Sequence, residues 1–408
     1  MARTTMTVKR AAAAFTPEAR IKRHLRQHLA DLGFTKDESG ALILPDDSKD
    51  TVRALHRKQR EDKASKNSSF VARFLPSLRL YFASGADVEP EKIRPKLQLV
   101  TGDGLEARLF RLAALTWSVP VSAGFGRRMR YLVWDENNGK LIGIFAIGDP
   151  VYNMGVRDDH IGWTVKDREK RLVNLMDAYV LGAIPPYNML LGGKLVACLI
   201  RTRDVYDDFR ARYGETEGII SGAAKNARLV AVTTSSSMGR SAVYNRLKLG
   251  ETSYFSSIGY TGGWGHFHIP DDLFEEMRNY LRAIDHGYAD MHTFGEGPNW
   301  RLRTVRAALN ALGFKEDILK HGIHREVFLC ETVGNSFDML KGAAKRPKLD
   351  GLLSVKQVGE LAVQRWMIGR AGRRPEYRAW SNTSLGDLIH QGSVTAAVEV
   401  GVTKTESA

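Results

Sequence analysis

Hydrophobic positions recur every three or four residues over residues 17–32, a spacing that predicts an amphipathic helix near the start of the chain. Thr16 precedes this segment as an N-cap, Pro17 occupies the first helical position, and Gly33 follows the last turn. The apolar face consists of Ile21, Leu25, Leu29 and Leu32, and the opposite face is basic. Further on, the pattern predicts a short strand at 41–44, a helical stretch over 48–82 and a loop over 87–95.

A central block alternates strand-like and helix-like segments. Two β-rich runs over residues 130–147 flank Asn138-Gly139, which is a strong hairpin signal. Helices are predicted at 172–182, 188–200, 204–213 and 271–283, and the apolar, β-branched run 228–234 predicts a buried central strand. The order favours an α/β or α+β fold, with a central mixed sheet, flanking helices, a helical N-terminal segment and a basic helical C-terminal extension.

These patterns divide the chain into five regions. We expect a disordered start over residues 1–15, a mostly helical N-terminal region over 16–125 and an α/β core over 126–285. A helix–strand extension follows over 286–340, and a basic C-terminal segment with a frayed tail covers 341–408.

The charge of this 408-residue chain is unevenly distributed. The formal net charge is +14 at pH 7, and most of the excess lies in two segments. Residues 1–30 carry seven basic and one acidic side chain, and residues 341–378 carry ten basic and three acidic ones. Basic ends of this kind favour contact with the phosphates of nucleic acid, and the alternative is a solubilising surface.

The sequence offers no sign of membrane or secretory character. No apolar run approaches the length of a membrane helix, and the start lacks the apolar core of a signal peptide. Only Cys198 and Cys330 are present, and both lie in apolar contexts, so we expect buried free thiols. A cytoplasmic protein without a membrane partner is predicted.

The densest candidate for anion binding is a hydroxyl-rich turn after the predicted central strand. Backbone N–H groups and hydroxyls at a strand-to-helix turn can hold phosphate, and arginine adds charge. The spacing is not that of a Walker loop, and the alternative is a polar loop with an N-capping serine. The predicted phosphate-binding residues are Ser235, Ser236, Ser237, Gly239, Arg240, Ser241, Arg246 and Lys248, with Tyr244 as a stacking residue.

Two further segments carry candidate catalytic side chains. His266 and His268 are two residues apart, so in a strand they would share a face as ligands of a divalent metal or as catalytic groups, and the nearby Trp264 would stack on a base. Asp159 and His160 would form an acid–base pair, with Trp163 as a stacking residue, or would simply start a capped helix. Gly-x-Ser-x-Gly, Rossmann, His-Glu-x-x-His and deaminase motifs are absent.

The chain resembles the DruA family of the Druantia anti-phage systems over about residues 15–345. The resemblance rests on the hairpin segment 141–146, His160-Ile-Gly-Trp163, the run 244–250, the glycine-rich run 259–268 and the flanking segments 299–303 and 321–328. It implies a bacterial or phage origin, a place among defence or mobile-element genes with other defence proteins as partners, and action on or near nucleic acid. The run 178–187 and the basic C-terminal segment depart from the expected family pattern.

A weaker, fold-level similarity is to the GNAT acyltransferases, whose core has a hairpin, a helix, a central strand and a backbone cradle for coenzyme A. Their Arg/Gln-x-x-Gly-x-Gly/Ala signature is missing. Three functions therefore remain open. The first is a nucleic-acid-binding defence protein whose phosphate contacts are Arg240, Arg246, Lys248, Arg301 and Arg303. The second is a transferase using a coenzyme A thioester, and the third is a metal-assisted nuclease or hydrolase.

Overall fold

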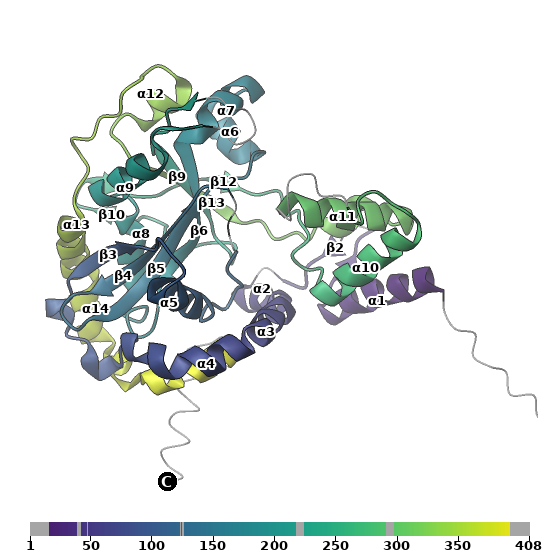
Figure 1. Cartoon of the computed structure of the whole chain (residues 1–408), viewed down its shortest axis with the longest axis horizontal. Coiled ribbons are helices and arrows are strands. Elements are labelled where there is room, and N and C mark those ends of the chain that lie inside the picture. The colour runs from purple at the N-terminus through teal and green to yellow at the C-terminus, as the bar shows by residue number, and fades with distance from the viewer. Residues whose placement is uncertain are drawn as a thin grey trace, which may run out of the picture. The chain divides into compact units, whose positions relative to one another are not determined.

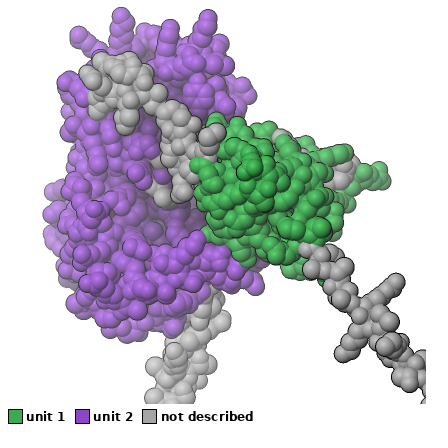
Figure 2. All heavy atoms as spheres, turned by 45° about the vertical axis from the view of Figure 1, so that its right-hand side comes forward, with its two compact units in different colours: residues 1–46, 264–322 green, residues 47–263, 323–408 purple. Residues whose placement is uncertain are grey.

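The computed structural model describes residues 16–38, 42–46, 48–122, 124, 126–217, 224–290 and 298–391 (Figure 1). The predicted disordered start and residues 392–408 of the predicted frayed tail lie outside these residues, whereas residues 386–391, where the tail was expected to begin, are helical. The chain forms two compact units, each built from two separate stretches (Figure 2). Unit 1 consists of residues 1–46 and 264–322, and unit 2 consists of residues 47–263 and 323–408.

Unit 2 is organised around a seven-stranded mixed sheet, which confirms the predicted fold class. The strand order is β12-β13-β9-β6-β5-β4-β3, and all neighbours are antiparallel except the parallel pair β6 and β9. The strands are β3 (Pro95–Leu99), β4 (Arg128–Asp135), β5 (Lys140–Gly148), β6 (Leu175–Ala183), β9 (Ala231–Ser235), β12 (Ser256–Tyr260) and β13 (Glu326–Glu331). The predicted hairpin is β4–β5, with Gly139 at φ +68 in its turn.

A separate hydrophobic core covers each face of this sheet. Side chains alternate between the faces, so Tyr131 and Leu132 on β4 belong to different cores. One core contains residues of α8 (Gly192–Leu199), α9 (Arg203–Tyr213) and α13 (Val355–Ala362), and the other contains residues of α4 (Ser68–Leu78) and α5 (Leu105–Ala114). Helices therefore pack on both sides of the sheet, and both predicted cysteines are buried and free.

Unit 1 contains α1 (Pro17–Asp31), α10 (Asp271–Ala283) and α11 (Pro298–Ala311), with the short strands β1 (Thr35–Lys36) and β2 (Leu42–Ile43). The first predicted helix is confirmed as α1: the Thr16 side chain accepts a hydrogen bond from Ala19 N, and Ile21, Leu25 and Leu29 are buried. Helix α10 also has the predicted bounds, and the acidic side chains of its first turn interact favourably with the helix dipole.

One of the predicted helices is wrong. Residues 172–182 form a 3-10 turn followed by β6, because this run is buried between β5 and β9 and contributes to cores on both faces. A short apolar run of this kind does not distinguish a buried strand from a buried helix. The predicted helical stretch 48–82 is confirmed. It consists of α2 (Lys49–Leu55), α3 (Arg57–Lys66), α4 and a 3-10 turn, with breaks at His56 and Asn67. The predicted loop 87–95 contains a 3-10 turn at Pro90–Lys92.

The basic C-terminal extension is helical, as predicted, and it is integrated into unit 2. It follows α12 (Ser336–Lys341) and consists of α13, a π-helical segment (Val363–Met367), α14 (Ile368–Arg373), two 3-10 turns and α15 (Leu385–Gln391). Its apolar residues Val358 and Met367 are fully buried in the core, so its charged residues are presented from a folded surface.

The remaining short elements connect these parts. They are α6 (Gly155–Ile161), α7 (Val165–Arg171), β7 (Thr216–Glu217), β8 (Ala224–Lys225), β10 (Lys248–Leu249), β11 (Thr252–Ser253) and the 3-10 turn Glu316–Leu319. Among the described residues, no helix combines the length and the apolar character needed to cross a membrane.

Candidate nucleic-acid interface

The serine-rich turn that follows β9 is closed by backbone hydrogen bonds. Ser236 N donates to Glu326 O over 2.8 Å, and Glu326 N donates to Gly239 O over 3.1 Å. Gly239 has φ +74, which an L side chain rarely adopts, so glycine suits this position. Ser241 Oγ accepts hydrogen bonds from Val243 N and Tyr244 N, so it caps the next turn. The turn is therefore a fixed structure beside β13.

An anion at this turn would meet a carboxylate. Glu326 is buried, and its Oε2 accepts a hydrogen bond from Ser241 N over 3.4 Å. The amide N–H groups of Ser236, Ser241 and Val243 are already engaged within the protein. To bind an anion through its backbone N–H groups, as the sequence predicted, the turn would thus have to break hydrogen bonds that it already makes within the protein. Arg240 is exposed at the tip of the turn and carries its charge outward.

The predicted residues after the turn differ in how accessible they are. Arg246 is exposed and adopts φ +54, whereas Lys248 pairs with Glu251 over 3.0 Å. Tyr244 packs against Phe255 and Phe328, with ring centres 5.2 and 5.3 Å apart. Burial raises the pKa of Tyr244 to about 12. Its ring is thus mainly part of the core, and Arg246 is the more accessible group.

The histidine pair lies in unit 1 and is largely buried. His268 Nε2 donates to Ile318 O over 2.9 Å, and the His268 carbonyl accepts a hydrogen bond from His28 Nε2 over 2.8 Å. Burial lowers the pKa of both His266 and His268 to about 4, and the nearby Arg301 charge contributes at His266. Both rings are therefore neutral at pH 7.

The surroundings of the pair offer few further metal ligands. Within the described parts of the chain, no group of three or more His, Cys, Asp or Glu side chains gathers where a metal ion would be held. Arg301 donates to Asp271 Oδ1 and to Ile269 O, both over 2.9 Å, and its guanidinium lies 4.2 Å from the Phe274 ring centre. Arg301 thereby stabilises unit 1 from within, while Arg303 and Trp264 are exposed.

The third candidate segment is the α6–α7 region of unit 2. Asp159 and His160 are exposed at the end of α6, and the His160 ring contacts Phe337 edge-on at 5.5 Å. Trp163 is only 8% exposed, and its Nε1 donates to Leu340 O over 2.7 Å. A base would reach the ring of Trp163 only if this contact opened. Asp159 and His160 end α6 and do not start a capped helix, and the next helix, α7, is capped by Thr164.

The predicted site residues thus divide between the two units. The serine-rich turn, Asp159, His160, Trp163, Arg246 and Lys248 belong to unit 2, and Trp264, His266, His268, Arg301 and Arg303 belong to unit 1.

Comparison with known proteins decides the family. The model of the family described as Druantia protein DruA matches residues 46–342. A curated protein from Escherichia coli (strain UMEA 4076-1), named Druantia protein DruA, is 57% identical over 388 residues, which cover 95% of this chain and 96% of that protein. The chain belongs to the DruA family. No solved structure matches it.

In this DruA-family chain, the structure adds a basic loop that the residue patterns did not single out. The basic loop comprises residues 341–348, and its charged side chains are exposed: Lys341, Lys345, Arg346 and Lys348. The buried Asn335 holds its backbone, since Nδ2 donates to Arg346 O over 3.0 Å and Oδ1 accepts from Lys348 N over 2.8 Å. The charge count indicated the wider basic segment 341–378, but only the structure shows that Asn335 fixes the backbone of the basic loop within it.

A partly buried ionic cluster lies at the junction of β6 and β9. Asp177 pairs with Thr233 in the parallel register, and Thr233 Oγ1 donates to Asp177 Oδ1 over 2.8 Å. Arg157 is fully buried, donates to Asp158 and to the carbonyls of Val151 and Tyr152, and its charge acts on Asp177. Burial raises the pKa of Asp177 to about 6. Sequence reasoning missed this cluster because it assigned residue 177 to a helix.

Proposed function

We propose that this DruA-family protein contributes to anti-phage defence by binding nucleic acid through its basic loop. The observation that carries the proposal is the combination of four exposed basic side chains within eight residues and a backbone held by Asn335. A fixed cluster of positive charge binds phosphates at a lower cost in conformational freedom than a flexible tail does.

Charge pairing within unit 2 supports this assignment. Lys341, Lys345, Arg346 and Lys348 form no ion pair with a carboxylate among the described residues, whereas many other surface cations do. Arg240 and Arg246 would extend the contact at the turn after β9, and Arg303 would be a separate phosphate contact of unit 1. Lys248 is a weaker contributor, since Glu251 offsets its charge.

The test is a salt series of binding to fluorescent single-stranded and duplex DNA and RNA. We expect the logarithm of the binding constant to fall linearly with that of the salt concentration, with a slope of about 0.9 per phosphate contact on duplex DNA. The variant K345A/R346A should lower the slope by about two. Absence of salt-dependent binding by the unaltered protein would overturn the proposal.

Two further variants locate the contact. R240A removes the exposed charge of the turn, and K92Q removes a lysine that pairs with Glu89 and should leave the slope unchanged. An effect of K345A/R346A no larger than that of K92Q would exclude the basic loop. A large effect of R240A alone would move the contact to the turn after β9.

A transferase activity is the second candidate, and the parallel pair β6/β9 favours it. Open sheets bind ligands beyond the carboxyl ends of parallel strands, and β9 runs directly into the serine-rich turn. Residues of this turn would hold the cofactor, a coenzyme A thioester, if Glu326 gave up its contacts. The expected result is a rise in melting temperature with acetyl-coenzyme A, which R240A diminishes. An unchanged melting temperature at millimolar ligand would remove this candidate.

A further inference from the structure

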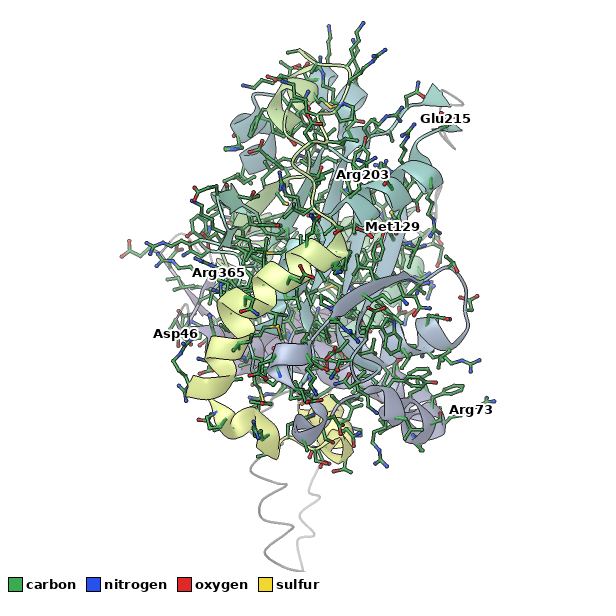
Figure 3. All side chains as sticks on the ribbon, turned by 90° about the vertical axis from the view of Figure 1, so that its left-hand side faces the viewer. Asp46, Arg73, Met129, Arg203, Glu215 and Arg365 are labelled. Atoms are coloured by element: carbon green, nitrogen blue, oxygen red, sulfur yellow. The ribbon has the colours of Figure 1, made fainter. Side chains whose placement is uncertain are left out.

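Three arginines gather around two phenylalanines where α4 packs against α5. We call this group the α4–α5 arginine face; it consists of Arg73, Arg108 and Arg111, with Phe70 and Phe74 beneath them. All three arginines are exposed, and Figure 3 shows Arg73 at the outer surface of α4. Phe70 is buried and Phe74 is half-buried, so both rings anchor the face to the core of unit 2.

The guanidinium groups lie over the phenylalanine rings, within the range of a cation–π interaction. Arg73 Cζ lies 5.1 Å and Arg108 Cζ lies 4.7 Å from the ring centre of Phe74. Because both distances are measured to the same ring, the two charges lie within about 10 Å of each other, comparable to the Debye length at 0.1 M salt. Arg111 lies 4.1 Å from the Phe70 ring centre, and its Nε donates to Asn67 Oδ1 over 2.9 Å.

These charges lack the acidic partners that other arginines have. Among the residues that the structure describes, no carboxylate forms an ion pair with Arg73, Arg108 or Arg111, whereas Arg53 pairs with Asp50 and Arg203 with Asp207. Like charges held together repel one another, so an anionic ligand gains affinity from relieving this repulsion. Stacking has also removed much of the side-chain freedom that binding would otherwise cost.

We propose that the α4–α5 arginine face is a second nucleic-acid contact, which binds the phosphates of one strand and stacks on its bases. This inference rests on the proposed function. The planar guanidinium matches phosphate in a bidentate manner and offers a flat face to a base, whereas lysine acts as a point charge. A face made of three stacked arginines therefore fits a nucleic-acid strand better than the headgroups of an anionic membrane.

Carboxylates placed one helical turn away test the face without removing the stacked arginines. Ser69 precedes Arg73 by four residues on α4, and Leu105, 40% exposed, precedes Arg108 by three on α5. In the variant S69E/L105E, each new carboxylate lies in a first helical turn, where it is favourable, and neutralises its arginine. The control K92Q/R203Q removes two positive charges that are already paired, so it lowers the net charge by the same amount.

The measurement is fluorescence anisotropy with a short single-stranded DNA over a salt series, together with the melting temperature of each variant. We expect S69E/L105E to weaken binding about tenfold or more at low salt and to lower the salt slope by about two, while K92Q/R203Q stays close to the unaltered protein. A second variant, R73K/R108K/R111K, keeps the charge and should still weaken binding, because lysine does not provide the guanidinium plane.

The outcomes separate this inference from the proposed function. If the unaltered protein binds but S69E/L105E binds equally well with an unchanged melting temperature, the face is not a contact and the basic loop stands alone. Full affinity of the lysine variant would contradict the stacking role. If the face variants lose binding to phosphatidylglycerol vesicles but not to DNA, the face is a membrane contact and the inference fails. Absence of all nucleic-acid binding would overturn both proposals.

Discussion

At the scale of single residues, Asp177 has an environment that the sequence did not indicate. A carboxylate in the centre of a sheet loses its hydration, and this loss outweighs the help from Thr233 and from the Arg157 charge, so the pKa of Asp177 rises to about 6. Since the unfolded chain has an ordinary aspartate pKa of about 3.8, the folded state binds this proton more readily. Ionisation of Asp177 therefore destabilises the fold as pH rises from about 4 to 6.

We predict that D177N removes this pH dependence. Relative to the unaltered protein, the free energy of unfolding of D177N should improve by up to about 3 kcal/mol between pH 4 and pH 8, because asparagine does not ionise. Urea titrations at pH 4, 6 and 8 measure this difference, and any constant cost of the substitution cancels in the comparison.

Asp167 provides a control of the opposite sign. Hydrogen bonds from Thr164 lower the pKa of this half-buried carboxyl to about 2, so its stabilising contribution is complete above pH 4 and is lost only as pH falls toward 2. The difference in the free energy of unfolding between D167N and the unaltered protein should thus stay constant between pH 5 and 8. A flat difference for D177N over pH 4–8 would contradict the burial of that carboxylate.

At the scale of elements, the close approach of β5 and β6 depends on a residue without a side chain. A Cβ atom at Gly143 would lie 2.3 Å from Gly182 O and 2.8 Å from Ala183 Cα, both of which are backbone atoms of β6. A Cβ atom at Gly139, in the turn before β5, would have no other atom within 4 Å, although the φ of +68 at this residue restricts substitution. Gly143 is thus required by the close approach of β6, whereas at Gly139 only the backbone conformation favours glycine.

We predict that G143A separates the two strands and lowers the free energy of unfolding by about 3 kcal/mol or more, since backbone atoms cannot move aside cheaply. G139N should cost about 1 kcal/mol or less, because asparagine tolerates the left-handed region. Thermal and urea denaturation of both variants provide the measurement. Equal stability of G143A and the unaltered protein would show that β5 and β6 pair less closely than described.

At the scale of the whole molecule, the C-terminal segment completes both cores of unit 2. Val358 and Met367 are fully buried on one face of the sheet, and Leu385 and Leu388 are almost fully buried in the core of the other face. The family model ends at residue 342, before all four of these positions. The C-terminal segment therefore contributes buried side chains to the folded core as well as positive charge to the surface.

We predict that a chain ending at Gly342 loses cooperative unfolding. Removing α13–α15 exposes apolar surface on both faces of the sheet, and each large core side chain contributes about 2 kcal/mol when buried. Dye binding to exposed apolar surface and near-ultraviolet circular dichroism report this loss. A chain ending at Gln391 keeps every described core residue and should melt as the full chain does; cooperative melting of the shorter chain would contradict the prediction.

Local sequence patterns were enough to predict several secondary-structure elements of this protein and the family to which it belongs. Helices α1 and α10 follow from apolar periodicity and from residues at their starts, and the β4–β5 hairpin follows from Asn138-Gly139, because these signals act over a few neighbouring residues. The uneven charge likewise identifies the C-terminal basic segment from the sequence alone. Membership of the DruA family agrees with the resemblance found in the motifs.

Only the tertiary structure decided which of these residues are accessible. Tryptophan and arginine are both common in nucleic-acid contacts. Here, however, Trp163 is enclosed and bonded to Leu340, and Arg301 is paired with Asp271. The strand β6 was mistaken for a helix because pairing with β5 and β9, which lie far apart in the chain, outweighs local preference. Residues 1–46 and 264–322 form one unit for the same reason: burial depends on contacts between distant segments, which no local pattern records.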